Sequence, residues 1–234
     1  RTIEARSVLD LDPDVVIVSR HFSPEVYREI ESAGVAMFSV GTGCELKDLM
    51  NNIKIIEKIT GSEKRAKDLS SFLKRYEDLI RERIGVLDPN GLPGVYHECA
   101  FARYKTTASC TSADSCISFA AGRNIACNVP SGKAVVNGEW VAKNNPEIII
   151  TQISSLSPEA GDLLKEKRDE MMSRPELGKT DAVKNGQVYV SHLSIRRGPR
   201  LITYLLYLAK WLHPDLFRDV NPAKAHRELL REFY

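Results

Sequence analysis

The sequence predicts an α/β protein with two lobes, each built on a mainly parallel sheet and joined by one long rigid helix. Short apolar runs at residues 15–18 and 148–150 are typical of buried parallel strands. Helical patterns alternate with such runs, as in βαβ units. Between the two βα regions, apolar residues recur at helical spacing over residues 62–84. We therefore expect three parts, namely a partial N-terminal lobe at 1–60, a connecting helix at 61–88, and a C-terminal lobe with C-terminal helices at 89–234.

The predicted connecting helix is amphipathic and unbroken. Ser62 is suited to cap its start, and Gly85 is suited to a left-handed residue at its end. About 23 residues at roughly 1.5 Å each give a length of some 35 Å. A surface helix of a single domain is the alternative. One face of the helix carries Ala66, Leu69, Leu73, Tyr76, Ile80 and Ile84.

The N-terminal lobe follows a βαβα order. The end of a helix over residues 4–11 leads to a strand at 15–18. A second helix opens at Ser23, with Pro24 in the first helical position, where its missing N–H costs nothing. A strand at 35–40 follows, and then a helix. Two strands are few for a stable sheet, so we expect this lobe to be incomplete at its N-terminus.

The C-terminal lobe repeats the pattern at greater length. Its elements are predicted in order as a strand at 94–98, a polar loop at 103–115 with a short helix after it, a helix from 139, a strand at 148–151, a charged helix at 158–173, a strand at 187–191, an apolar helix from 198 to 213 and a final helix at 222–232. Residues 11–18 and 144–151 share one plan of helix end, polar-Pro-acid turn and buried strand, which fits two lobes built alike.

Composition excludes several classes of function. A net charge of +2 argues against a general nucleic-acid binder, and no apolar run approaches the 18 residues of a membrane span. The five cysteines have neither C-x-x-C nor zinc-finger spacing. No Gly-x-Ser-x-Gly, Walker loop or His-Glu-x-x-His occurs. We therefore expect no enzyme and no intrinsic cofactor, and a rival cysteine-nucleophile enzyme using His97 or His192 is disfavoured.

Several phrases resemble one family, the periplasmic or cell-surface substrate-binding proteins of ABC importers for iron–siderophore, haem, cobalamin and related metal complexes. Each phrase is weak alone, but their order spans nearly the whole chain. They are Leu-Asp-Pro-Asp-Val-Val-Ile (11–17), Ile-Thr-Gly-Ser-Glu-Lys-Arg-Ala (59–66), Ala-Gly-Arg-Asn-Ile-Ala (121–126), Gly-Glu-Trp-Val-Ala-Lys-Asn-Asn-Pro-Glu-Ile-Ile-Ile (138–150), Ala-Val-Lys-Asn-Gly-Gln-Val-Tyr-Val (182–190) and Gly-Pro-Arg to Asp-Leu-Phe (198–217).

The resemblance implies two α/β lobes on one long helix, a metal complex bound between them, and an ABC permease as partner. It implies an extracytoplasmic location, with a lipid anchor carried by an N-terminal portion outside this chain. We expect a monomer whose ligand is a ferric complex. An oxyanion receptor for molybdate or tungstate, using the same arginines, is one alternative. An interaction module that binds no small ligand is another.

Ligands of open α/β sheets bind beyond the carboxyl ends of the strands, where loops converge. That rule nominates Arg20 and His21, residues 42–44, residues 97–105, Thr151 and Gln152, and residues 192–197. Guanidinium and tyrosine side chains suit anionic complexes. We predict no metal ligation by the protein itself, because adjacent strand residues such as His97 and Glu98 point to opposite faces. The predicted ligand contacts are Arg20, His97, Glu98, Tyr104, Lys105, His192, Arg196 and Arg197.

Two further predictions concern docking and covalent structure. By resemblance, a glutamate on each lobe meets arginines of the permease. Glu139 falls at the family's position in the C-terminal lobe, whereas Arg6 occupies the equivalent N-terminal place and leaves Glu4 as a substitute. Glu139 also suits the first turn of a helix, where the positive end of the helix dipole stabilises its negative charge. If the protein is exported, Cys110 and Cys116 could form a disulfide across a small polar loop.

Overall fold

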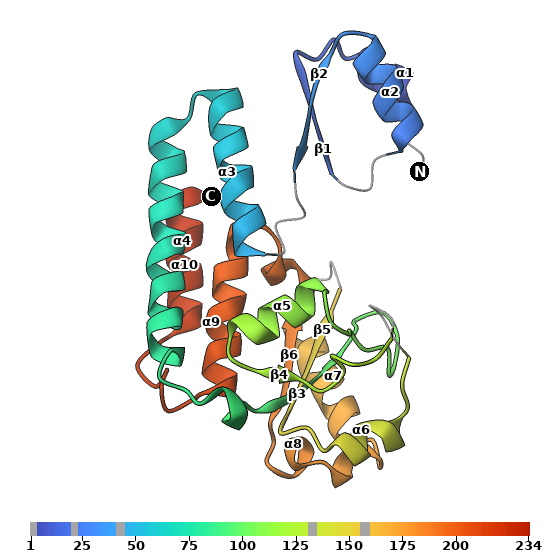
Figure 1. Ribbon diagram of the computed structural model, residues 1–234, viewed down its shortest axis with the longest axis vertical. Helices are drawn as coiled ribbons and strands as arrows, with labels where there is room; N and C mark the ends of the chain where they lie inside the picture. The colour runs from blue at the N-terminus through green and yellow to red at the C-terminus, as the bar shows by residue number, and fades with distance from the viewer. Residues whose placement is uncertain (1–3, 20–22, 41–44, 131–134, 155–159) are drawn as a thin grey trace. The chain divides into compact units, whose positions relative to one another are not determined.

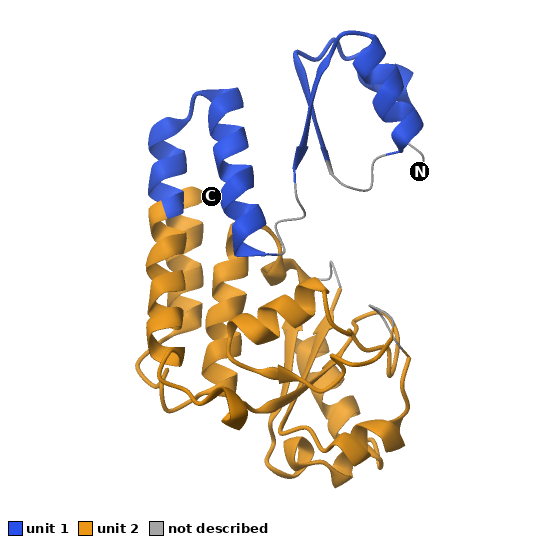
Figure 2. Cartoon of the chain, viewed as in Figure 1, with its two compact units in different colours: residues 1–70 blue, residues 71–234 orange. Residues whose placement is uncertain are grey.

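The computed structural model describes residues 4–19, 23–40, 45–130, 135–154 and 160–234. The chain forms two compact units, residues 1–70 and 71–234 (Figure 2). Each unit has its own parallel sheet, as the two-stranded β1-β2 and the four-stranded β4-β3-β5-β6. The predicted fold class, α/β with mainly parallel sheets, is therefore confirmed.

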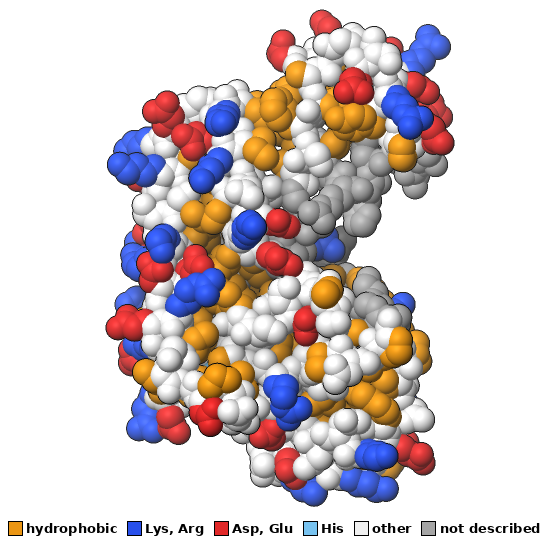
Figure 3. Space-filling model, in the orientation of Figure 1, with side chains coloured by type: hydrophobic (Ala, Val, Ile, Leu, Met, Phe, Trp, Pro, Cys, Tyr) orange, Lys and Arg blue, Asp and Glu red, His pale blue; other side chains and the backbone are white. Residues whose placement is uncertain are grey.

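Unit 1 holds the smaller sheet. Its elements are α1 (Ala5–Leu9), β1 (Val15–Ser19), α2 (Pro24–Ser32), β2 (Ala36–Val40), α3 (Leu46–Thr60) and the first residues of α4. β1 and β2 pair in parallel, with Ile17 opposite Phe38. Both side chains remain 40–45% exposed, and Figure 3 shows hydrophobic side chains on this unit where the strands lie. The sheet face that they form is thus only partly covered.

The long helix expected over residues 62–84 is present as α4 (Glu63–Ile84). It starts two residues after Gly61, which ends α3 in the left-handed conformation at φ 65°. Gly85 follows its last residue, and Pro89 opens a short 3-10 turn, η1 (Pro89–Gly91). The first eight residues of α4 belong to unit 1 and the remainder to unit 2. Its role as a rigid connector stays a prediction.

Unit 2 is built on four parallel strands (Figure 1). β3 (Gly94–Glu98) and β5 (Ile148–Ile153) form the centre, with β4 (Arg123–Asn124) and β6 (Val188–His192) at the edges. Central strands that are covered on both faces favour apolar runs, as in β5, whereas β3 is buried throughout although it carries His97 and Glu98. The remaining elements in chain order are α5 (Ser112–Phe119), α6 (Gly138–Asn144), α7 (Ala160–Met172), η2 (Leu177–Lys179), α8 (Asp181–Lys184), η3 (Leu193–Arg196), η4 (Gly198–Arg200), α9 (Leu201–Leu212) and α10 (Pro222–Phe233).

Alternate strand residues of this sheet enter two different cores. On one face Tyr96 and Ile149 pack with Val141 of α6, Met171 of α7 and Ala182 of α8. Burial of each of the larger aliphatic side chains, Ile149, Val141 and Met171, contributes about 1.5–3 kcal/mol. On the other face lie Val95, Ile117 of α5 and Leu212 of α9, which crowd around Gly122 so closely that an added Cβ would sit 2.4–3.1 Å from their side chains.

The C-terminal helices complete unit 2. α9 is almost wholly apolar and buried, and its Trp211 stacks on Tyr189 of β6 with ring centroids 4.6 Å apart. α10 packs on α9 and, through Phe233, contacts Phe72 of α4 edge-to-face at 5.6 Å. The hydroxyl of Tyr76 also donates to Glu228 of α10 at 2.8 Å. These contacts hold the C-terminal part of α4 within unit 2.

Candidate functional site

The predicted ligand residues of unit 2 come together at one edge of its sheet. β3, β5 and β6 end there, and their register places Glu98 opposite Thr151 and Ile153 opposite His192. The loops that leave these strands carry residues 99–107 and η3. We call this surface, formed by the ends of β3, β5 and β6 and the loops that follow them, the carboxyl edge. Parallel topology gathers polar side chains there.

Arg196 binds other parts of this edge together. Its guanidinium donates to Gln152 Oε1 at 3.0 Å, at the end of β5, and to Ser112 Oγ at 2.7 Å, in the first turn of α5. The side chain is half-buried. It thus links η3, β5 and α5, and its geometry is that of a residue that positions the loops.

His97 is buried on the face of β3 that packs against α5. Its Nδ1 lies 3.2 Å from Thr107 Oγ1, and its side chain is 3% exposed. Burial, and after it the positive charge of Arg196, lower the pKa of His97 from 6.5 to about 3. The imidazole is therefore neutral at physiological pH and has almost no surface to offer a ligand.

Glu98 points to the opposite face, as strand alternation predicts. Its carboxylate accepts from Arg174 at 2.7 and 2.9 Å and from the backbone N–H of Tyr104 at 2.9 Å. Lys167 approaches at 3.5 Å, and the Glu98 side chain is fully buried. The prediction that Glu98 contacts ligand needs correction, because both oxygens are occupied inside the protein.

The loop after β3 combines cationic and apolar side chains. Tyr104 adopts φ 55°, and its hydroxyl donates to Glu176 at 3.3 Å. Arg103 lies over the Tyr104 ring at 5.2 Å, and Lys105 is half-buried. Phe101 is 72% exposed, although sequence reasoning did not single it out. The signal available in the sequence was an aromatic residue in the loop that follows a predicted strand.

The loop after β6 contributes His192 and Arg197. The Nδ1 of His192 lies 2.7 Å from Ser194 Oγ and also accepts from the Ser194 backbone N–H at 3.2 Å. Arg197 is exposed, in contrast to its neighbour Arg196. Of the two arginines predicted in this loop, Arg197 is the one exposed to solvent.

The remaining predicted residues lie elsewhere. Arg20, His21 and residues 42–44 fall outside the described residues. Glu139 is exposed in the first turn of α6, where Asn137 caps the helix by accepting from Trp140 N at 2.8 Å. Glu4 is exposed at the start of α1. Both glutamates are thus accessible.

The disulfide that Cys110 and Cys116 could form on export is not formed in this structure, where both residues are thiols. Cys110 is exposed in a left-handed conformation at φ 60°, whereas Cys116 is buried in α5. At the start of α5, Asp114 accepts from the backbone N–H of Cys110 at 3.2 Å and Thr111 accepts from the backbone N–H of Asp114 at 3.3 Å. Cys116 instead belongs to the packed face of the helix.

Among the described residues, no three His, Cys, Asp or Glu side chains gather closely enough to hold a metal ion. No helix within the described ranges combines the length and apolar character needed to cross a bilayer.

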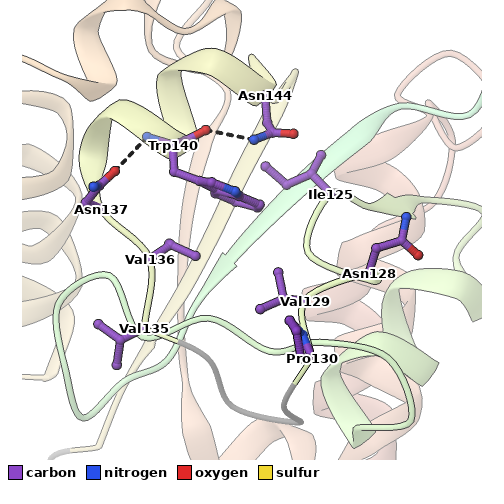
Figure 4. A pocket seen from close by; sticks show the side chains of 9 residues that line it. All are labelled: Ile125, Asn128, Val129, Pro130, Val135, Val136, Asn137, Trp140 and Asn144. Atoms are coloured by element: carbon purple, nitrogen blue, oxygen red, sulfur yellow. Dashed lines mark hydrogen bonds between the residues drawn. The ribbon is translucent and has the colours of Figure 1, made fainter.

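A hollow of about 680 Å³ lies beside the carboxyl edge, between the segment after β4 and α6 (Figure 4). The indole of Trp140 forms one wall, between Ile125 and Val136. Val136 donates its N–H to Tyr104 O at 3.0 Å, so this wall is bonded to the loop after β3. The nine lining residues are Ile125, Asn128, Val129, Pro130, Val135, Val136, Asn137, Trp140 and Asn144.

Comparison with known proteins gives a consistent assignment. The sequence matches the family described as periplasmic binding protein over residues 1–192. It is 25% identical over 223 residues to an uncharacterized ABC transporter substrate-binding lipoprotein, YvrC of Bacillus subtilis, covering 93% of this chain and 67% of that protein.

Solved structures show the same fold. The TroA-like periplasmic binding protein FepB from Veillonella parvula superposes with a TM-score of 0.85 at 24% identity, covering all of this chain and 72% of that one. Helicobacter pylori CeuE, solved as a nickel–histidine complex, superposes with a TM-score of 0.75 at 20% identity, again covering all of this chain and 72% of that one.

Proposed function

Since the chain belongs to the periplasmic binding protein family of ABC transporters, we propose that it captures an anionic iron–siderophore or related metal complex and delivers it to an ABC importer. The chain acts as a receptor and carries out no catalytic step. Its place of action is the periplasm or the cell surface, and its partner is the membrane permease.

The observation that carries the proposal is the mixed character of the carboxyl edge. Arg103 and Arg197 are exposed there, and Lys105 is half-buried. Val135, which is 75% exposed, forms a β-bridge with Lys105, and Phe101, which is 72% exposed, belongs to the same loop after β3 as Arg103 and Lys105. Organic metal complexes combine negative charge with flat apolar groups, so this surface suits them.

The same observation disfavours a bare oxyanion as cargo. Molybdate is small and wholly polar, and it would need converging donors in an enclosed site. The guanidinium of Arg196 already donates to Gln152 and Ser112. The exposed apolar side chains of Phe101 and Val135 cannot donate hydrogen bonds to such an ion. The oxyanion receptor therefore stays the alternative that the experiment must exclude.

Delivery requires recognition by the permease. Glu139 and Glu4, both exposed, are the groups that we propose to pair with permease arginines. Exposed carboxylates steer association by complementary charge, which acts mostly on the rate of encounter. Glu139 sits on a short capped helix, so its position is fixed relative to the sheet.

Calorimetric titration tests the cargo directly. The protein is titrated with ferric enterobactin, which is anionic, with ferrichrome, which is neutral, and with haem, nickel–histidine and molybdate. We expect an anionic organic complex to bind at least tenfold more tightly than ferrichrome, and molybdate to give no heat. Tighter binding of molybdate would establish the oxyanion receptor instead. Absence of heat with every compound would support the interaction module.

A further inference from the structure

We propose that the hollow lined by Trp140 is a second small-molecule site, and that it takes a neutral saccharide. This inference does not rest on the cargo proposed above, although Val135 belongs to both surfaces. The hollow encloses about 680 Å³, within the roughly 300–1,000 Å³ typical of small-molecule sites. A sugar of one or two rings is of the right scale for such a space.

The lining excludes charged ligands. None of its nine residues is a lysine, arginine, histidine, aspartate or glutamate. Among the described lining residues an anion would meet no cation and a cation no carboxylate, so either would lose hydration without compensation there. Lys105 of the carboxyl edge bridges Val135 through the backbone, but its side chain is not among those that line the hollow.

The lining also excludes a purely apolar ligand. Asparagines 128, 137 and 144 stand around the hollow with the indole N–H of Trp140. Asn137 uses its Oδ1 to accept from Trp140 N, which leaves its amide N–H groups for a ligand. Asn144 donates from Nδ2 to Trp140 O at 2.8 Å, which leaves its Oδ1 as an acceptor. An occupant without hydroxyl or amide groups would leave these atoms unpaired.

The arrangement of apolar and polar groups matches a sugar ring. In Figure 4 the indole ring, Ile125, Val129 and Val136 surround the middle of the hollow, and the asparagines stand at its margin. A sugar presents C–H groups on its faces and hydroxyls around its edge. Each hydroxyl both donates and accepts, which suits amides that offer either role.

Both walls are held by the sheet and its loops. Ile125 donates its N–H to Val95 O at 3.1 Å and so continues the pairing of β4 with β3. On the other wall, Val136 is bonded to Tyr104 O and Val135 bridges Lys105. Because the walls are already held in place, ligand binding avoids most of the entropic cost of ordering them.

The two tryptophans of the chain allow a specific readout. Trp211→Phe leaves Trp140 as the only tryptophan, and Trp140→Phe leaves only Trp211. Each variant is titrated with glucose, maltose, trehalose and N-acetylglucosamine while tryptophan emission is recorded. Glucuronate and glucosamine serve as anionic and cationic counterparts of glucose. We expect a saturable change with a neutral sugar in Trp211→Phe and none in Trp140→Phe.

A matched pair of asparagine variants locates the site. Asn128→Ala removes an exposed amide at the margin and should weaken sugar binding about three- to tenfold, as for one lost hydrogen bond. Asn51→Ala, an exposed position on α3, should leave binding unchanged. Titration of Asn128→Ala with ferric enterobactin checks that the cargo site is intact.

Several results would overturn the inference. One is the absence of saturable binding for every neutral sugar up to about 10 mM by calorimetry and saturation-transfer NMR. Others are equal affinity for glucuronate or glucosamine, a response confined to Trp211, and equal effects of Asn128→Ala and Asn51→Ala. None of these results bears on whether the protein binds a ferric complex, so the two proposals fail separately.

Discussion

Glu98 and Arg174 form a two-point ion pair inside unit 2, with oxygen–nitrogen distances of 2.7 and 2.9 Å. The side chains are 0% and 3% exposed. Arg174 also donates to Glu170, whose pKa falls to about 2 because of that hydrogen bond. The pair ties the end of β3 to the segment that follows α7.

Breaking this pair should destabilise unit 2 strongly. Glu98→Gln leaves Arg174 only with the more exposed Glu170, and Arg174→Met leaves Glu98 only with Lys167 at 3.5 Å, so each change should cost up to the roughly 3–5 kcal/mol of a broken buried pair. The double variant should lose less than the sum of the two single losses, because it removes both charges. Urea unfolding followed by circular dichroism measures the three differences. Additive losses, or single losses below about 1 kcal/mol, would show that the pair is not coupled.

His97 should make stability fall in mild acid. The unfolded chain takes up a proton near the ordinary histidine pKa of 6.5, whereas the folded protein keeps His97 neutral until about pH 3. Between pH 6.5 and about pH 3 the unfolded state therefore binds more protons than the folded state. The free energy of unfolding consequently decreases as pH falls. From pH 6.5 to 5 the expected loss is roughly 2 kcal/mol.

His97→Gln tests this origin of acid sensitivity. Unfolding free energies are measured at pH 7, 6 and 5, where aspartates and glutamates titrate little. The variant should be less sensitive to pH than the wild type over this range, whatever its stability at pH 7. An identical slope in both proteins would place the acid sensitivity elsewhere.

Gly138 begins α6 at a close approach. A Cβ on Gly138 would lie 2.6 Å from Glu176 Cβ and 2.9 Å from Tyr104 Oη. Gly138→Ala should therefore cost about 1–3 kcal/mol by overpacking. Gly161, in α7, has open space at its Cβ position, so Gly161→Ala should be neutral or stabilising by up to about 1 kcal/mol. Thermal unfolding of the two variants provides the comparison, and equal changes in Tm would refute the steric account.

Arg197 should contribute to cargo affinity through charge. Arg197→Gln is expected to weaken binding of ferric enterobactin about threefold to tenfold at low salt, with a smaller effect at high salt because exposed charges are screened. Arg227→Gln on α10 is the matched control, since it removes an exposed cation away from the carboxyl edge. Calorimetry at two salt concentrations gives the measurement. Equal weakening by both changes would indicate general charge attraction only.

Docking can be separated from capture. Glu139→Ala should reduce stimulation of the permease ATPase in lipid nanodiscs while leaving cargo affinity unchanged. Glu4→Ala tests whether the N-terminal lobe contributes a second contact, and it should have a comparable effect if Glu4 replaces the residue that the family carries there. Normal stimulation by the double variant would remove both residues from the docking surface.

Periodicity predicted the helices and strands well, because the buried side of each element is visible as a repeat of apolar residues in the local sequence. The 3.6-residue repeat gave α4, and apolar runs gave β1 and β5, since both signals reflect which side of an element is covered. The carboxyl-edge rule also brought residues 97–105 and 192–197 together. These features depend on chain order and parallel topology alone.

The roles of individual side chains were harder to predict. Glu98 and Arg196 look like ligand contacts in the sequence, yet Glu98 pairs with Arg174 76 residues away and Arg196 with Ser112 84 residues away. Such partners are chosen by tertiary packing, which local pattern does not encode. The hollow beside Trp140 escaped notice for the same reason, because its walls come from two segments that flank residues 131–134.

The position of α4 has a practical consequence for cutting the gene into halves. A fragment that ends at residue 70 would keep only the first eight residues of α4, which are too few to stay helical alone. Phe72, on the same helix, would lie in the other fragment. Ending it after Gly85 would instead strip α10 of its partners Phe72 and Tyr76. Neither half should express as a stable product, and heating the intact chain should give one shared melting transition.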